Sequence, residues 1–143
     1  MASEPKVAYA WELEKVHCLF HYTYVDHAQR FDHERIYVVS DRPHQKHGHG
    51  LFLTTINPLE MSAVDLLKRL FVMQREPENV EAVLVFLRDA NVLTIKPAGN
   101  RCYVHPAPAG AEIDLETVYL GYGRRVPTGA GWLFSSGLHS VKT

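Results

Sequence analysis

The chain has 143 residues, the length of one ordinary domain and enough to bury a core. Hydrophobic residues make up 46% and charged residues 22%, which excludes a wholly disordered chain. Lys and Arg total 15 against 16 Asp and Glu, and the basic residues form no stripe of the kind that phosphate-contacting proteins carry. We therefore expect one domain over residues 1–143, a monomer, with no nucleic-acid partner.

The apolar patterning argues against a membrane protein. The longest purely apolar run, Ala82–Leu87, has six residues, whereas a spanning helix needs about 20. The first residues, MASEPKVAYAW, lack the apolar centre of a secretory signal, so we expect a cytoplasmic location by default. The two cysteines, Cys18 and Cys102, lie in apolar runs, which favours buried free thiols over a disulfide.

The first part of the chain alternates strand and helix signals. Short apolar or β-branched runs predict strands over residues 16–20, 36–39 and 51–54. Residues 26–35 are polar with two apolar positions three apart, which favours a short helix. Residues 41–50, with one proline, two glycines and no apolar residue, predict a loop.

The next segment carries the clearest helix signal. Asn57 can cap a helix with Pro58 in its first turn, and a second start is Ser62 with Asp65 three residues on. Apolar residues then recur at helical spacing up to about Met73: Ala63, Leu67, Leu70 and Phe71.

The remainder reads as strands and loops. Strands are expected over residues 81–87, 92–95, 102–104, 117–122 and 131–134, with a loop at residues 107–110. The order of elements is not the regular alternation of a parallel doubly wound fold. It predicts an α+β fold with a largely antiparallel sheet.

Two short segments carry candidate chemistry. The first is LFHYT at residues 19–23, a strand that delivers His21 with a hydroxyl residue two positions on. The second is GHGLFLT at residues 48–54, a glycine loop that leads into a strand carrying Phe52. Ser40 lies between them in sequence, at the end of the second expected strand.

At these residues the chain resembles the ADP-ribosyltransferase superfamily, most nearly the HYD-type toxin transferases, which are named for a His-Tyr-Asp set. Their first motif is similar to residues 19–23. Their second, a Gly-x-Gly-x-Tyr-Leu-Thr sequence followed by a proline and a helix, is similar to residues 48–54 and Pro58. The likeness covers residues 16–123. It implies a split antiparallel β-sandwich, two small packed sheets with flanking helices and an NAD cleft between them.

The resemblance also implies which residues contact the NAD substrate. His21 would hydrogen-bond the ribose on the adenosine side, the backbone of Tyr22 would clamp the carboxamide, Phe52 would stack on the nicotinamide ring, and Gly50 would allow close approach of the ligand. Phe52 stands where the family has tyrosine, so stacking is retained and any role of the hydroxyl is lost. The full NAD-binding set is His21, Tyr22, Thr23, Ser40, Gly50 and Phe52.

The implied reaction cleaves the nicotinamide–ribose bond of NAD through a cationic, oxocarbenium-like sugar. The ADP-ribose then passes to a macromolecular acceptor, such as a protein, or to water. The family uses a late acidic residue beside the breaking bond, where a carboxylate favours positive charge. Asp89, Glu112 and Asp114 are the candidates here, and Asp114 is preferred as the catalytic partner of His21 because it precedes a later strand.

Two alternatives remain open. The chain could be an inactive relative that binds NAD, ADP-ribose or a protein without turnover. Two features favour this alternative: no single acidic residue is marked out as catalytic, and Phe52 replaces the tyrosine of the family. His44, His47 and His49 have a spacing that zinc or copper can use. However, Asp41 is the one further ligand in that loop and no rigid frame is evident, so a solvated loop without metal is the prediction.

Overall fold

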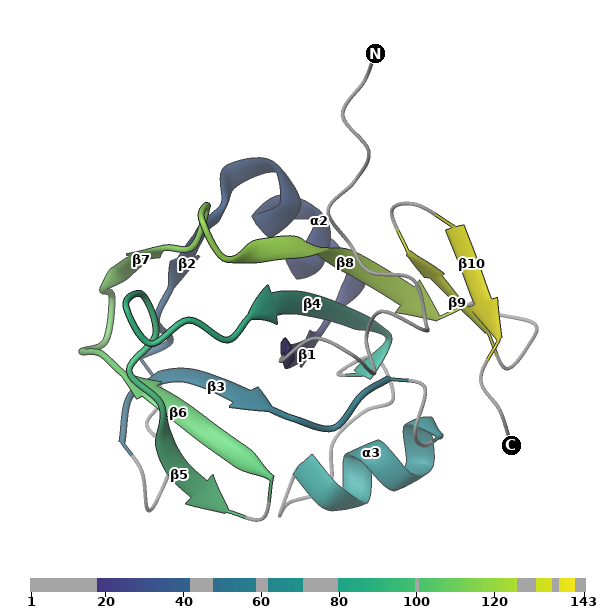
Figure 1. Cartoon of the computed structure of the whole chain (residues 1–143), viewed down its shortest axis with the longest axis horizontal. Coiled ribbons are helices and arrows are strands. Elements are labelled where there is room, and N and C mark those ends of the chain that lie inside the picture. The colour runs from purple at the N-terminus through teal and green to yellow at the C-terminus, as the bar shows by residue number, and fades with distance from the viewer. Residues whose placement is uncertain are drawn as a thin grey trace.

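The computed structural model describes residues 18–41, 48–58, 62–70, 80–99, 101–125, 131–134 and 137–140. Within these ranges the chain forms a mixed fold of two helices and ten strands, with every strand pair antiparallel (Figure 1). The helices are α2 (Val25–Glu34) and α3 (Ala63–Leu70). The strands are β1 (Cys18–Thr23), β2 (Ile36–Val38), β3 (Gly50–Thr54), β4 (Ala82–Leu87), β5 (Lys96–Gly99), β6 (Cys102–Pro106), β7 (Glu112–Asp114), β8 (Tyr119–Arg125), β9 (Gly131–Phe134) and β10 (Gly137–Ser140).

The sheets are unequal in size. Eight strands form one sheet in the order β10-β9-β8-β4-β1-β3-β6-β5, and β2 and β7 form a separate two-stranded sheet. In the large sheet β1 pairs with β4 along its whole length, from Cys18↔Leu87 to Thr23↔Ala82. On its other side the pairing with β3 consists of Phe20↔Thr54. The large sheet therefore has one weakly paired seam, between β1 and β3.

The chain buries both faces of β1. Because side chains alternate along a strand, Cys18, Phe20 and Tyr22 enter one core cluster and Leu19 enters another. The first cluster includes Leu66 of α3, and the second includes Ala28 and Phe31 of α2, so the helices cover opposite faces of the large sheet. Tyr37 and Ile113 bring the β2–β7 sheet onto the α2 side.

Most expected elements are confirmed with shifted ends. The helix expected at residues 26–35 is α2, and of the two proposed starts for the next helix Ser62 is correct. Its Oγ accepts the N–H of Asp65 at 3.2 Å, as an N-cap does. The continuation of this helix toward Met73 lies outside the described residues.

The strand expected at residues 92–95 is wrong. These residues follow a turn in which the carbonyl of Asp89 accepts the N–H groups of Val92 and Leu93, and the next strand is β5. Leu93 is 1% exposed, so the apolar run reflects burial of a turn rather than extended structure. The strand β7 had no signal, because three residues are too few to show alternation.

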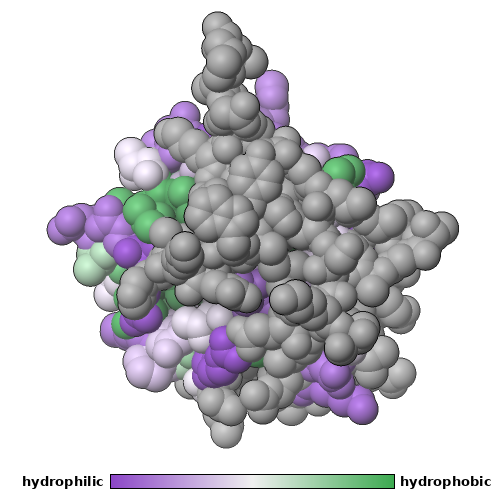
Figure 2. All heavy atoms as spheres, turned by 45° about the vertical axis from the view of Figure 1, so that its right-hand side comes forward, coloured by the Kyte–Doolittle hydropathy of each residue, from purple (hydrophilic) through white to green (hydrophobic). Residues whose placement is uncertain are grey.

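On the face that Figure 2 displays, a small hydrophobic group lies among hydrophilic described residues. Neither helix in the described part of the chain has the length and apolar character needed to cross a membrane.

Gly50 is required by the close approach of β6 to β3. A Cβ at this position would lie 2.4 Å from the carbonyl oxygen of His105 and 2.8 Å from Cγ2 of Val104. Gly48 differs, because its φ of +70° favours glycine while the space around it is open. Of the two glycines in the second motif, Gly50 thus allows β3 and β6 to pack closely.

We predict that Gly50→Ala lowers the free energy of unfolding by about 3 kcal/mol, because a backbone oxygen cannot move away cheaply. Gly48→Ala is the matched control and should cost about 1 kcal/mol, from its left-handed backbone alone. Urea unfolding of the two variants beside the wild type measures both values. Equal losses in the two variants would contradict the packing role of Gly50.

Candidate functional site

The central feature of the candidate site is the His21 ring at the seam between β1 and β3. Its Nδ1–H donates a hydrogen bond of 2.8 Å to the carbonyl oxygen of Phe52. The ring of Tyr37 lies edge-on at 5.4 Å between centroids. The two sequence motifs therefore lie on neighbouring strands, and a side chain of the first bonds the backbone of the second.

This arrangement fixes the protonation state of His21. A carbonyl accepts only, so Nδ1 carries the proton and Nε2 of the neutral ring is an acceptor. Burial lowers the pKa of His21 below its usual value, opposed by the hydrogen bond to Phe52 and assisted by the charge of His27. The side chain is partly exposed, and the bond to Phe52 is its one hydrogen bond in the described structure. The neutral ring can therefore accept a hydrogen bond from a ligand hydroxyl.

Tyr22 points to the opposite face of the sheet. Its hydroxyl donates to the carbonyl of Ile56 at 2.8 Å, and its ring contacts Trp132 edge-on at 6.3 Å. The side chain is 7% exposed and belongs to the core on the α3 side. The Tyr22 side chain is therefore held in the core, and the carboxamide contact that the resemblance implies would fall to its backbone, which lies on β1.

The backbone carbonyl of Phe52 bonds His21, but its ring lies on the other face of the sheet. Its carbonyl bonds His21, while the alternation of β3 directs its partly exposed ring to the face that Tyr22 shares. A ligand that contacts both the imidazole and this ring must cross the seam.

The remaining expected NAD contacts lie around this centre without converging on it. Thr23 is buried, and its Oγ1 lies 3.4 Å from Nδ1 of His27. Ser40 is exposed beyond the end of β2. The space beside Gly50 is filled by β6.

The three candidate acids are not brought to His21. Glu112 and Asp114 are exposed on β7, whose inward residue, Ile113, is the one facing the core. Tyr37 pairs with Ile113 and contacts His21, so both of these side chains lie on the inner face of the small sheet. The carboxylates of β7 therefore project from its other face, away from His21. Asp89 caps its own turn, where its Oδ1 accepts the N–H of Asn91 at 2.9 Å.

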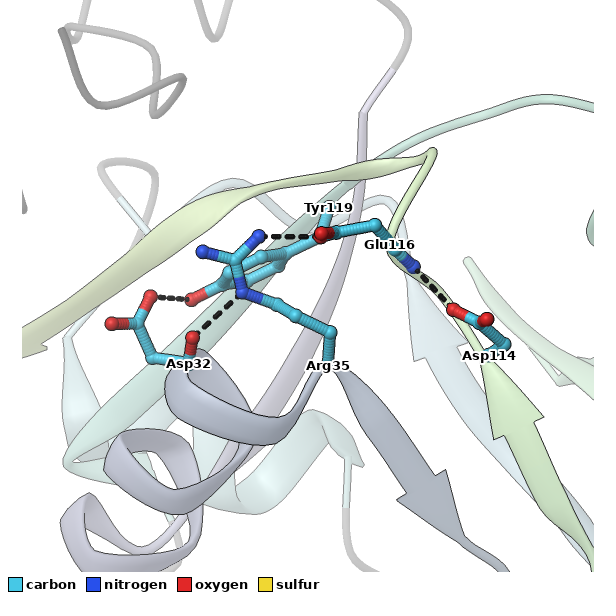
Figure 3. Close-up of polar contacts among 5 residues, drawn as sticks. All are labelled: Asp32, Arg35, Asp114, Glu116 and Tyr119. Carbon is cyan, nitrogen blue, oxygen red and sulfur yellow. Dashed lines mark hydrogen bonds and ion pairs between the residues drawn. The ribbon is translucent and has the colours of Figure 1, made fainter. Parts of the chain in front are cut away.

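Asp114 takes part in a polar cluster at the other end of the small sheet (Figure 3). Its Oδ1 accepts the N–H of Glu116 at 3.0 Å, and the carboxylate of Glu116 pairs with Arg35 at 2.7 Å. Arg35 ends α2 with a φ of +63°, and its guanidinium lies 4.6 Å from the ring centre of Tyr119. The hydroxyl of Tyr119 donates to Asp32 at 2.6 Å. These contacts tie α2 to the start of β8 and serve the fold.

Tyr119 is the buried residue of this cluster. Burial first, and then the hydrogen bond to Asp32 and its charge, raise the pKa of Tyr119 far above its usual value. The phenol therefore stays protonated and keeps donating to the carboxylate. A hydrogen bond to a charged group of this kind contributes about 1.5–3 kcal/mol.

We predict that Tyr119→Phe lowers the free energy of unfolding by about 2 kcal/mol, because Asp32 loses a donor in a partly buried place. Tyr103→Phe is the control, since Tyr103 is partly buried and its ring lies 5.4 Å from the guanidinium carbon of Arg88, with no hydroxyl hydrogen bond in the described structure. Chemical denaturation should show little change for the control. A loss as large at Tyr103 would show that the bond to Asp32 is not what stabilises the chain.

The histidine loop is only partly described. His49 donates from Nε2 to the carbonyl of Asp41 at 3.1 Å, while His44 and His47 lie outside the described residues. No group of three or more metal-ligating side chains occurs among the residues that the structure describes. The described part of the loop thus shows a structural hydrogen bond.

Tyr37 is the residue of this site that sequence reasoning missed. Its signal was present, since alternation along residues 36–39 places Tyr37 and Val39 on one face and both are at least partly buried. Burial raises the pKa of Tyr37, which keeps its hydroxyl protonated beside His21.

No protein-family model, curated protein or solved structure matches this chain. The chemistry of the site therefore rests on its own residues.

The lowered pKa of His21 predicts a pH dependence of stability. His21 binds a proton more tightly in the unfolded chain than in the folded one. The contribution of neutral His21 to the free energy of unfolding is therefore complete above about pH 6.5, and it is lost as the pH falls toward the pKa of the folded state. His21→Asn keeps a donor near the position of Nδ1 and does not titrate there. On acidification, the free energy of unfolding of the wild type should therefore fall more than that of His21→Asn.

Urea unfolding at several pH values between about 5 and 8 measures this difference and cancels the contribution of the other histidines. A constant difference across that range would show that His21 titrates alike in both states and would contradict the prediction.

Proposed function

We propose that this chain is an ADP-ribosyltransferase-like protein that binds NAD at the β1–β3 seam, with recognition rather than turnover as its principal activity. The observation that carries the proposal is the hydrogen bond from Nδ1 of His21 to the carbonyl of Phe52. It joins the two motifs of the resemblance and leaves Nε2 to accept a hydroxyl of the ligand's ribose.

The form of the large sheet supports this proposal. With β1 and β3 paired at Phe20↔Thr54, the sheet is divisible into a five-stranded part, β10-β9-β8-β4-β1, and a three-stranded part, β3-β6-β5. An ADP-ribosyltransferase fold is a split antiparallel arrangement with the dinucleotide between its halves. The seam would be the corresponding place here. The backbone of β1 beside it suits a carboxamide, and Nε2 of His21 suits a ribose hydroxyl.

The position of the acids favours binding over cleavage. Stabilising an oxocarbenium-like sugar needs a carboxylate at the reacting carbon. Glu112 and Asp114 leave the far face of the small sheet, and Asp89 is engaged in its own turn. The site around His21 thus offers hydrogen bonds and apolar surface that hold a ligand, and none of the three candidate acids, as the described residues place them, adds the charge that would speed bond cleavage.

Transfer of ADP-ribose to a protein acceptor or to water is the second candidate. It is supported by the position of the two motifs on neighbouring strands, β1 and β3. In that case one of the three candidate acids must reach the bound ribose, and Asp114 remains the preferred one.

His21 offers a matched pair of variants that tests the binding site. His21→Asn retains a donor for Phe52 and removes the outer nitrogen, whereas His21→Gln places an amide oxygen near the position of Nε2. We expect NAD affinity to fall about tenfold in the Asn variant, the loss of one hydrogen bond to a ligand, and by less than about threefold in the Gln variant. Calorimetric titration with NAD measures both.

The outcomes are distinct. Unchanged affinity in His21→Asn would remove His21 from the binding site, and absence of NAD binding to the wild type would overturn the proposal. Release of nicotinamide from the same samples, with cell lysate as acceptor, separates the two candidates. Release that is lost in His21→Asn and in Asp114→Asn would establish the transferase in place of the binding module.

A further inference from the structure

The outer face of the β2–β7 sheet combines exposed apolar side chains with carboxylates. Ile36 lies opposite Asp114 and Val38 lies opposite Glu112 in the pairing of the two strands. Ile36 is 39% and Val38 57% exposed, among the largest exposures of hydrophobic residues in the described chain. The inward residue of β2 packs on the core, so these four side chains share the solvent-facing side.

The backbone of β2 also has an edge with which no strand of the described ranges pairs. In an antiparallel pair, alternate residues direct their N–H and C=O groups to the partner strand. On β2 the carbonyl of Arg35 accepts from Leu115 and the N–H of Val39 donates to Ala111. Ile36 and Val38 therefore direct their backbone groups to the other side, where no described strand pairs with them. Such an edge is a template for a further strand.

We propose that this edge of β2 takes up an extended basic segment of a protein partner as a third strand. Adjacent strands lie about 4.8 Å apart, so Glu112 and Asp114 lie about 9–10 Å from the added strand. A lysine or arginine on that strand spans this distance with its aliphatic stem across Ile36 or Val38 and its charge at the carboxylate. The segment that fits carries Lys or Arg at every second position.

The charges of the described residues select this partner. Arg35 immediately precedes β2, and its guanidinium is paired with Glu116 at 2.7 Å and stacked on Tyr119. It therefore does not neutralise Glu112. Asp114 remains exposed although it accepts the N–H of Glu116. An acidic segment would meet both carboxylates unpaired, whereas a basic one complements them.

The test uses the whole chain and a short synthetic peptide that alternates lysine and valine. We expect a dissociation constant of about 100 μM or below, with shifts of the backbone amide signals of Ile36 and Val38 in nuclear magnetic resonance spectra. A control peptide with glutamate in place of lysine should not bind. Lack of binding by the lysine peptide, or signal shifts confined to other residues, would overturn the proposal.

Three variants separate the contributions of charge and backbone. Glu112→Gln together with Asp114→Asn should weaken binding at least about fivefold. Asp26→Asn, the removal of an exposed charge in the first turn of α2, should leave it unchanged. Val38→Pro removes an edge N–H without changing charge and should abolish binding. The same melting temperature as wild type is required of each variant that is compared.

A reversal of specificity excludes a merely structural effect. Glu112→Lys with Asp114→Asn should bind the glutamate peptide and reject the lysine peptide. If binding to the lysine peptide survives this change, the carboxylates do not select the partner. A dimer of the free chain that dissociates on Val38→Lys in sedimentation experiments would assign the edge to a second copy and would also overturn the proposal.

Discussion

The structure depends on the burial of β1 on both of its faces. Leu19 and Phe20 are consecutive and both almost fully buried, each in a different core. Burial of two such side chains contributes about 3–6 kcal/mol, comparable with the whole stability of a small domain. A strand placed in this way lies at the centre of its sheet, and the polar residues that follow on the same strand are carried into the interior with it.

Two hydrogen bonds add to the burial of its apolar faces in specifying the register of that strand. His21 reaches the carbonyl of Phe52 on one face, and Tyr22 reaches the carbonyl of Ile56 on the other. A shift of β1 by one residue would exchange the faces of these side chains and leave buried polar atoms without partners, each at a cost of about 1–3 kcal/mol. The residues of the candidate site thus also contribute to the fold, so the stability of each His21 variant has to be measured beside its affinity for a ligand.

The sequence was sufficient for a mixed, mostly antiparallel α/β fold and for placing His21 on a strand, because both depend on local pattern. Alternation and helical spacing locate the helices and most strands, and LFHYT marks His21. The partner of His21 is a backbone carbonyl 31 residues away, which no side-chain pattern identifies. The separation of Phe52 from His21 by the plane of the sheet depends on the register of β1 and β3, a tertiary property. The outward direction of Asp114 follows from alternation only once a three-residue strand is known to be there.

The small β2–β7 sheet connects the two surfaces that the proposals concern. Tyr37 faces inward and contacts His21, while its neighbours Ile36 and Val38 face solvent. An added strand on β2 would hold Tyr37 in place through the backbone between those neighbours, and a ligand at His21 would contact the same ring from within. Because Arg35 and Tyr119 already anchor the start of β2 to β8, the sheet is restrained at that end, and any movement transmitted between the two surfaces has to arise toward Val38. Tyr37 is thus the residue that contacts His21 from the strand whose neighbouring positions face solvent, and coupling between the two proposed binding events would have to pass through it.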